Sequence, residues 1–194
     1  NFQADGFSPD GYVDEVISHV QNISGTRFIP MGIPDKYLAR ASSIEAVLVS
    51  YAAGRWRPHL MNQAMLRGVA KAFPLHLHDM VEELWDYKVL EKALASFWVY
   101  FSPVMMAGGP PLACIEAFMA GMPVILHDPH GHFSGFISGE HCFFVNSDRE
   151  AIFAAQTLWS SQTLRERIGE AGREKAKEVF NISPFVEGWQ EVAK

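Results

Sequence analysis

The chain has 194 residues, of which 48% are apolar and 20% charged, and its formal net charge is −6. This composition is that of a globular protein, and the length suffices for one full hydrophobic core. The acidic balance excludes a general electrostatic attraction to nucleic acid or to an anionic lipid surface.

The first 42 residues are expected to form an N-terminal helix and a linker outside the main domain. Asp10 is placed to cap a helix over residues 11–23. A short strand is expected over residues 26–29. The prolines and the glycine that follow predict a turn-rich linker reaching Ser42.

From Ser43 onward, short apolar segments alternate with helical patterns. Strands are predicted over residues 45–52, 74–78, 97–101, 123–126 and 141–145. Helices are predicted over residues 58–73, 87–96, 149–160, 162–180 and 183–192, with one more around Glu116. This alternation predicts an α/β fold in which helices cover both faces of a parallel, Rossmann-like sheet, in one domain over residues 43–180, followed by a helical segment, 181–194.

The two cysteines, Cys114 and Cys142, both lie in apolar runs, which predicts buried free thiols in a reducing compartment. Their number and spacing indicate neither a zinc site nor a disulfide framework. The sequence shows no signal-peptide pattern and no apolar stretch long enough to span a bilayer. A cytoplasmic location is therefore expected.

Glu116 is the one formally charged residue between Ala93 and His127. A carboxylate on an otherwise apolar helix is costly unless it is paired, hydrogen-bonded or at a wet edge. One interpretation is a ligand, since a carboxylate can accept two hydrogen bonds from the vicinal hydroxyls of a ribose. The other is a buried glutamate whose partners are the backbone or an arginine.

The turn Gly108-Gly109-Pro110-Pro111 leads into the helix of Glu116. Glycines let an anion approach the backbone closely, and the start of a helix presents free N–H groups to it. Because proline has no N–H, the donors would be Gly109, Leu112 and Ala113. The alternative is a tight strand-to-helix turn with proline at the first helical position.

Two further loops follow predicted strands, and ligands of open parallel sheets bind at the carboxyl ends of strands. Arg55 and Arg57 follow the first strand, and guanidinium groups suit a diphosphate, although solvation at the surface explains either arginine equally well. The loop His127–His132 has three histidines but no frame to fix tetrahedral geometry. We therefore expect this loop to line a sugar pocket. Metal binding by its histidines stays an alternative.

These residues together resemble a known family. From about Val47 to the C-terminus, the chain resembles the C-terminal, nucleotide-sugar-binding half of GT-B glycosyltransferases of the group 1, family-4-like retaining class. The family motif is Glu-Gly-Phe-Gly-Leu-Pro-x-x-Glu-Ala-x-Ala-x-Gly-x-Pro-Val after a strand. The residues in register with it are Gly109, Leu112, Glu116, Ala117, Gly121, Pro123 and Val124. Gly54-Arg55 is similar to a Gly-Arg that follows the family's first strand in this half.

The resemblance implies transfer of a sugar from a nucleoside diphosphate sugar to an acceptor. Arg55, which would stabilise the leaving diphosphate, and Glu116, which would bind the ribose, are the expected catalytic residues. The expected donor-binding residues are Gly54, Arg57, Gly108, Gly109, Leu112 and Ala113. The donor is a substrate, so no cofactor and no metal are expected.

The resemblance also implies partners and structure beyond the donor site. The acceptor would bind to an N-terminal domain that this chain does not include, and the final helix would cross back toward that domain. Peripheral association of the full protein with a membrane stays open, and no nucleic acid is expected as a partner.

Two departures from the family pattern favour a second interpretation. The family places an acidic residue eight positions before the glutamate, where this chain has Gly108. The family also tends to place a lysine soon after the Gly-Arg, where this chain has Arg57 and His59. The alternative is therefore a degenerate, non-catalytic domain that binds a nucleotide sugar or a partner protein.

Overall fold

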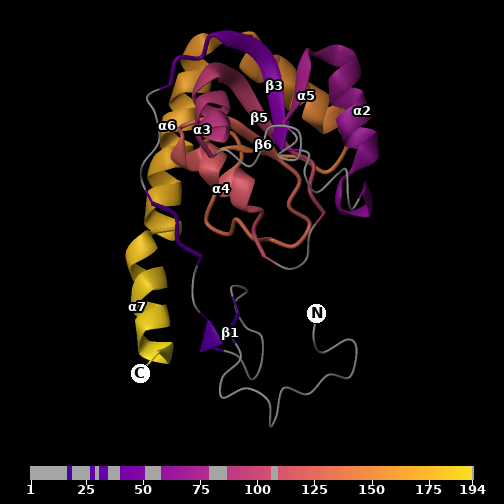
Figure 1. Cartoon of the computed structure of the whole chain (residues 1–194). Helices are drawn as coiled ribbons and strands as arrows, with labels where there is room; N and C mark the ends of the chain where they lie inside the picture. Colours follow the sequence, from indigo (N-terminus) through magenta and orange to yellow (C-terminus); the bar gives the residue numbers. More distant parts are fainter. Residues whose placement is uncertain are drawn as a thin grey trace.

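The structure is a computed structural model that describes residues 17–18, 27–28, 31–34, 40–50, 58–78, 87–105 and 109–193. Its main body is a five-stranded sheet with helices on both faces (Figure 1). The strands are β3 (Ile44–Ser50), β4 (Leu75–His78), β5 (Phe97–Ser102), β6 (Val124–Leu126) and β7 (Phe143–Phe144). The helices are η1 (Pro58–Leu60), α2 (Gln63–Ala72), α3 (Tyr87–Ser96), α4 (Leu112–Met119), α5 (Asp148–Trp159), α6 (Gln162–Val179) and α7 (Ile182–Val192).

All five strands are parallel, in the order β4-β3-β5-β6-β7. The chain passes from β3 outward to β4 and then returns to the other side of β3 as β5. The strand order therefore reverses between β3 and β5, and open parallel sheets bind ligands at such a point. This topology confirms the predicted Rossmann-like α/β domain.

Two apolar layers enclose the sheet because side chains alternate between its faces. On β3, Leu48 packs with α3 and α4, whereas Val47 and Val49 pack with α2 and α5. The helix α6 contributes to both layers, with Ile168 on one side and Ala176 on the other. From the end of α6, α7 continues away from the sheet (Figure 1).

The helix predicted over residues 58–73 begins later in the structure. Pro58 opens a single 3-10 turn, and α2 starts after Asn62, whose side-chain oxygen accepts a hydrogen bond from the Met65 amide at 3.1 Å. Asparagine is a favoured capping residue. The backbone N–H of Asn62 also donates a hydrogen bond to the carbonyl oxygen of Pro103, at 2.7 Å. This contact ties the connection after β3 to the connection after β5.

The N-terminal helix prediction is wrong where the structure describes that segment. Ile17–Ser18 form a strand, β1, that pairs in parallel with β2 (Arg27–Phe28), so the predicted strand over residues 26–29 is confirmed in its centre. Strand pairing gives these backbone groups partners, and a β-branched residue such as Ile17 fits a strand well. The expected cap, Asp10, lies outside the described residues.

Two smaller expectations have clear outcomes. Cys114 and Cys142 are buried free thiols, as predicted. The strand predicted over residues 141–145 is shorter, because the preceding turn holds Cys142 through a 2.7 Å hydrogen bond from the Gly139 amide to its carbonyl oxygen. Within the described part of the chain, none of the helices has the length and apolar character needed to cross a membrane.

Candidate functional site

The candidate site lies at the carboxyl ends of the two central strands, where the strand order reverses. Ser50 ends β3, and Ser102 ends β5. Four of the residues predicted to form the site, namely Gly54, Arg55, Arg57 and Gly108, lie outside the described residues. Because β3 and β5 are parallel neighbours, Ser50 and Ser102 lie at the same edge of the sheet.

Gly109 has a backbone conformation that glycine alone adopts readily. Its φ is +129°, a region that side chains with a Cβ disfavour. A Cβ built on it would meet no atom within 4 Å, so the space beside this backbone is open. Both features were expected of a turn that a ligand approaches closely, although they fit a tight strand-to-helix turn as well.

The start of α4 leaves backbone donors at the same edge. Pro111 is the N-cap and provides no side-chain hydrogen bond. The amides of Cys114 and Ile115 both donate to the Pro111 carbonyl oxygen, at 3.0 and 3.3 Å. The amides of Leu112 and Ala113 have no such bond to the described residues, and the Leu112 residue is 54% exposed. Within the described part of the chain, two N–H groups at the positive end of α4 therefore have no acceptor and can receive an anion.

Glu116 lies in the second turn of α4 and is only 8% exposed. Its carboxylate makes no hydrogen bond or ion pair with the residues that the structure describes. Burial raises the pKa of this carboxyl from 4.5 to about 7. A buried, uncompensated carboxyl group is costly to the fold, which is the property expected of a group kept for a ligand.

Tyr100 of β5 is a buried neighbour of Glu116 that the sequence interpretation did not single out. Its hydroxyl is hydrogen-bonded to the backbone and side chain of Ser50, at the end of β3. Burial raises the pKa of Tyr100 well above its usual value, and Cys114 and Glu116 raise it further. The alternation of side chains along residues 97–101 could have assigned Tyr100 to the face that α4 covers.

Hydrogen bonds to side chains and backbone groups fix the conformation of the histidine loop after β6. A ring nitrogen of His127, Nδ1, lies 2.9 Å from the Val145 carbonyl oxygen. The Asp128 carboxylate accepts hydrogen bonds from the amides of His132 and Phe133, at 3.0 and 2.9 Å. The described residues, which include this whole loop, contain no group of three or more histidines, cysteines, aspartates or glutamates that could hold a metal ion.

Taken together, this edge can bind a ligand that has both an anionic group and hydroxyls. The open backbone at Gly109 suits the anion, and so do the α4 amides that have no acceptor among the described residues. The Glu116 carboxylate can accept hydrogen bonds from hydroxyl groups. Gly109, Leu112, Ala113 and Glu116 lie on one turn and the helix α4 that follows it.

Solved structures provide the comparison with known proteins. TarM matches with a TM-score of 0.73 and 14% identity, over 97% of this chain and 45% of its own. HepE of Anabaena, solved in complex with UDP-glucose, matches with a TM-score of 0.73 and 12% identity, over 98% of this chain and 69% of its own. The C-terminal domain of a group 1 glycosyl transferase (LpcC) from Francisella tularensis matches with a TM-score of 0.53 and 13% identity, over 78% of this chain and 100% of that domain.

These matches concern the fold. No protein-family model matches the sequence, and no curated protein matches it either. The chain spans less than half of TarM but matches the whole of the isolated C-terminal domain. The chain therefore has the fold of a C-terminal domain of GT-B glycosyltransferases, as the motif around Glu116 indicated.

Proposed function

We propose that this chain is the donor-binding part of a glycosyltransferase, which transfers a sugar from a nucleoside diphosphate sugar to an acceptor. The observation that carries the proposal is the Glu116 carboxyl, which is buried and without a partner among the described residues. It lies on the helix that begins at the strand-order reversal. The complex of HepE with UDP-glucose supports a nucleotide sugar as the ligand class, since HepE shares the fold at a TM-score of 0.73.

Each residue of the edge has a role in this proposal. The Glu116 carboxylate accepts hydrogen bonds from the ribose hydroxyls. The backbone of Gly109 and the amides of Leu112 and Ala113 face the phosphates or the sugar. The flanking residues Gly54, Arg57 and Gly108, which lie outside the described residues, complete the donor site.

The chemistry proposed for these groups is electrostatic. Breaking the bond between the sugar and the diphosphate leaves negative charge on the leaving group. Arg55 and the amides at the start of α4 stabilise that charge, and a fixed donor of this kind lowers the barrier because it needs no reorganisation. We propose retention at the transferred sugar by likeness to the group 1 class alone.

A second candidate function is favoured by one specific residue. Where the family motif has an acid, the chain has Gly108, so the contact that this acid makes with the donor sugar is lost. A domain without it can bind the nucleotide and still fail to transfer the sugar. The candidate is a non-catalytic nucleotide-sugar-binding or partner-binding domain of the same fold.

Calorimetric titration with UDP, GDP and ADP tests the binding proposal. We expect one nucleotide to bind, and we expect Glu116→Gln and Arg55→Gln each to weaken binding by about tenfold or more, since each removes hydrogen bonds to or from a charged group. The matched controls are Glu187→Gln and Arg167→Gln, both exposed on the last two helices, and they should bind as the parent does. If no nucleotide binds, or if all four variants bind equally, the proposal is wrong.

Sugar transfer by the protein that includes an acceptor domain then separates the two candidate functions. Transfer that Arg55→Gln abolishes supports the enzyme. Nucleotide binding without transfer, in the parent protein and with each donor sugar tried, supports the non-catalytic domain.

A further inference from the structure

The pairing between β3 and β5 ends before the two strands do. Among the described residues, β3 pairs with β5 as far as Leu48 and Tyr100, whereas Ser50 pairs with β4 and Ser102 pairs with β6. The ends of the two central strands therefore pair with the outer strands and not with each other. This is the point where the strand order reverses and where the candidate site lies.

The side chain of Tyr100 joins the two strands beyond the last pair of this ladder. Tyr100 is 2% exposed and lies in the apolar layer that α4 covers. Its ladder partner is Leu48, but its hydroxyl is hydrogen-bonded to the backbone and side chain of Ser50, two residues further along β3. A side chain thus ties β5 to the end of β3 where backbone pairing has stopped.

A second tie, here called the clasp, joins the backbones of the two connections that follow these strands. The Asn62 amide donates to the Pro103 carbonyl oxygen, and the Met105 amide donates to the Leu60 carbonyl oxygen, each at 2.7 Å. Asn62 is also the N-cap of α2, and Pro103 directly follows β5. The clasp therefore holds the connection after β3 at the place where it leads into α2.

The two ties hold the connection after β3 at both of its described ends. Tyr100 holds it where it leaves β3, and the clasp holds it where α2 begins. On the other side of both ties is β5, from which the chain leads to α4 and Glu116. A ligand that contacts both connections then binds to groups that are already in place, and a displacement of about 1 Å in such a site can reduce its function strongly.

We propose that the Tyr100 hydroxyl and the backbone N–H of Asn62 are positioning groups of the donor site, which fix the connection after β3 relative to Glu116. Neither group touches the ligand. The inference rests on the proposed function, in which Glu116 binds the ribose and the connection after β3 contributes to binding the diphosphate. Loss of either tie therefore weakens the binding of a nucleoside diphosphate more than that of its nucleoside.

The clasp can be opened by one substitution that the local backbone accepts. The φ of Asn62 is −73°, which proline adopts, and Met61 before it pairs with Val104 as a β-bridge, in the extended conformation that a residue before proline prefers. Asn62→Pro removes the N–H, and the ring takes the place of the hydrogen, so the Pro103 carbonyl must move away. Asn62→Ala loses the same side-chain cap but keeps the N–H, which makes it the matched control.

Amide hydrogen exchange of the free protein tests whether the two ties exist. The Met105 amide should exchange slowly in the parent and in Asn62→Ala, and about tenfold faster in Asn62→Pro, because an opened clasp exposes it to water. The Ser50 amide should exchange faster in Tyr100→Phe than in the parent. Fast exchange of the Met105 amide in the parent would overturn the clasp without any ligand being involved.

Titration with UDP, GDP and ADP, and with the three matching nucleosides, tests the positioning role. For the nucleotide that binds, we expect the dissociation constant of Asn62→Pro to exceed that of Asn62→Ala by about tenfold, and that of Tyr100→Phe to exceed the parent value by about tenfold. The dissociation constants for the nucleoside should change by less than about twofold.

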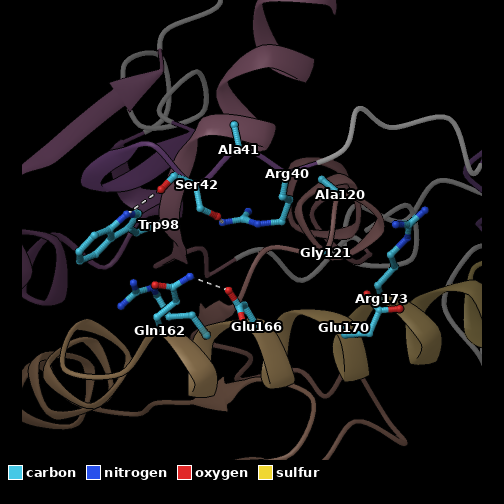
Figure 2. Close-up of a pocket in the computed structure, with 11 residues that line it drawn as sticks. Arg40, Ala41, Ser42, Trp98, Ala120, Gly121, Gln162, Glu166, Glu170 and Arg173 are labelled. Atoms are coloured by element: carbon cyan, nitrogen blue, oxygen red, sulfur yellow. Dashed lines mark hydrogen bonds between the residues drawn. The ribbon is translucent and has the colours of Figure 1, made fainter.

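Trp98→Phe is the structural control, because it breaks a tie between the same two strands at the opposite edge. Trp98 of β5 donates a hydrogen bond from Nε1 to the Ser42 carbonyl oxygen, just before β3, at 2.9 Å (Figure 2). This variant should be less stable than the parent in urea, yet its ratio of nucleotide to nucleoside affinity should equal that of the parent.

Two results would overturn the positioning role. One is an equal loss of nucleotide and nucleoside affinity in Tyr100→Phe and Asn62→Pro, and the other is a change in the affinity ratio of Trp98→Phe as large as that of Tyr100→Phe. Either would mean that Tyr100 and Asn62 only stabilise the fold, while the parent still binds its nucleotide and the proposed function stands. If the parent binds no nucleotide, the proposed function and the positioning role fail together, and the exchange rates still decide whether the ties exist.

Discussion

Gly169 of α6 packs directly against Gly121, in the turn between α4 and β6. A Cβ on Gly169 would collide with the carbonyl oxygen of Gly121 and would lie 3.4 Å from the Pro123 nitrogen. The obstructing atoms are backbone, which cannot rotate away as a side chain can. This contact therefore sets how closely α6 approaches α4, the helix that carries Glu116.

We expect Gly169→Ala to lower the free energy of unfolding by about 2 kcal/mol or more, although alanine is the better helix former. Urea unfolding measures the change. Gly68→Ala, in the middle of α2, is the control, because its nearest obstruction is a side-chain atom, the Asp148 Cβ at 3.1 Å. If Gly169→Ala is no less stable than Gly68→Ala, the close contact between α6 and the Gly121 turn does not exist in solution.

The Glu116 carboxyl should make the protein less stable as the pH rises. The folded protein keeps this proton up to about pH 7, whereas the unfolded chain loses it near pH 4.5, so stability falls through this interval. Glu116→Gln has no charge to bury. Between pH 4.5 and pH 8, we expect the free energy of unfolding of this variant to rise by on the order of 3 kcal/mol relative to that of the parent.

Unfolding by urea at a series of pH values checks this expectation. Glu187→Gln, at an exposed position of α7, should follow the parent at every pH. A parent and a Glu116→Gln variant with parallel pH profiles would mean that the carboxylate has a partner in the folded protein, and the ligand role proposed for it would lose its support.

The sequence predicted the sheet well because its strands are short apolar runs with turn residues between them. The run from Phe97 to Phe101 has no competing helical pattern, and the structure makes it β5. The two wrong predictions, the start of the helix after Pro58 and the helix over residues 11–23, both rested on local sequence patterns. Pro58 is compatible with the first turn of a helix, but Asn62 provides a side-chain cap four residues later, and the helix begins there. Over residues 11–23 the apolar spacing suited a helix, whereas Ile17–Ser18 pair as a strand.

The site was predictable only in part, and for a physical reason. Glu116 was conspicuous because a single charge in an apolar helix needs an explanation. Tyr100 and Ser50 were not, since their contact depends on β3 and β5 being neighbours, and a sequence without its topology does not show which strands pair.

Arg165 should be far more important to stability than its place on a charged helix suggests. Its guanidinium binds two carbonyl oxygens at the end of α5 and stacks on Trp98. Lysine can replace neither the fork of donors nor the flat contact. We expect Arg165→Lys to lose about 2 kcal/mol in the free energy of unfolding. Arg167→Lys, two residues away and exposed, should lose almost nothing, and equal losses in the two variants would contradict the packing seen here.

Substitutions at Gly109 and at a control glycine can separate the contribution of the turn to stability from its contribution to nucleotide binding. Its φ of +129° disfavours any residue with a Cβ, as does the φ of +82° at Gly139, and a Cβ at either position would meet no atom within 4 Å. Replacing either glycine by alanine should therefore cost about 1–3 kcal/mol through backbone strain alone. Gly139 belongs to the turn before β7, away from the start of α4.

Nucleotide binding should respond to one of these two variants only. In Gly109→Ala the backbone must shift, which displaces the amides of Leu112 and Ala113 from the anion, and we expect the dissociation constant for the bound nucleotide to rise by about tenfold. In Gly139→Ala the constant should stay within twofold of the parent value, about the scatter of such a titration. Calorimetry at a temperature where both variants are folded makes the comparison. Equal affinities in the two variants would place the anion somewhere other than the turn that opens α4.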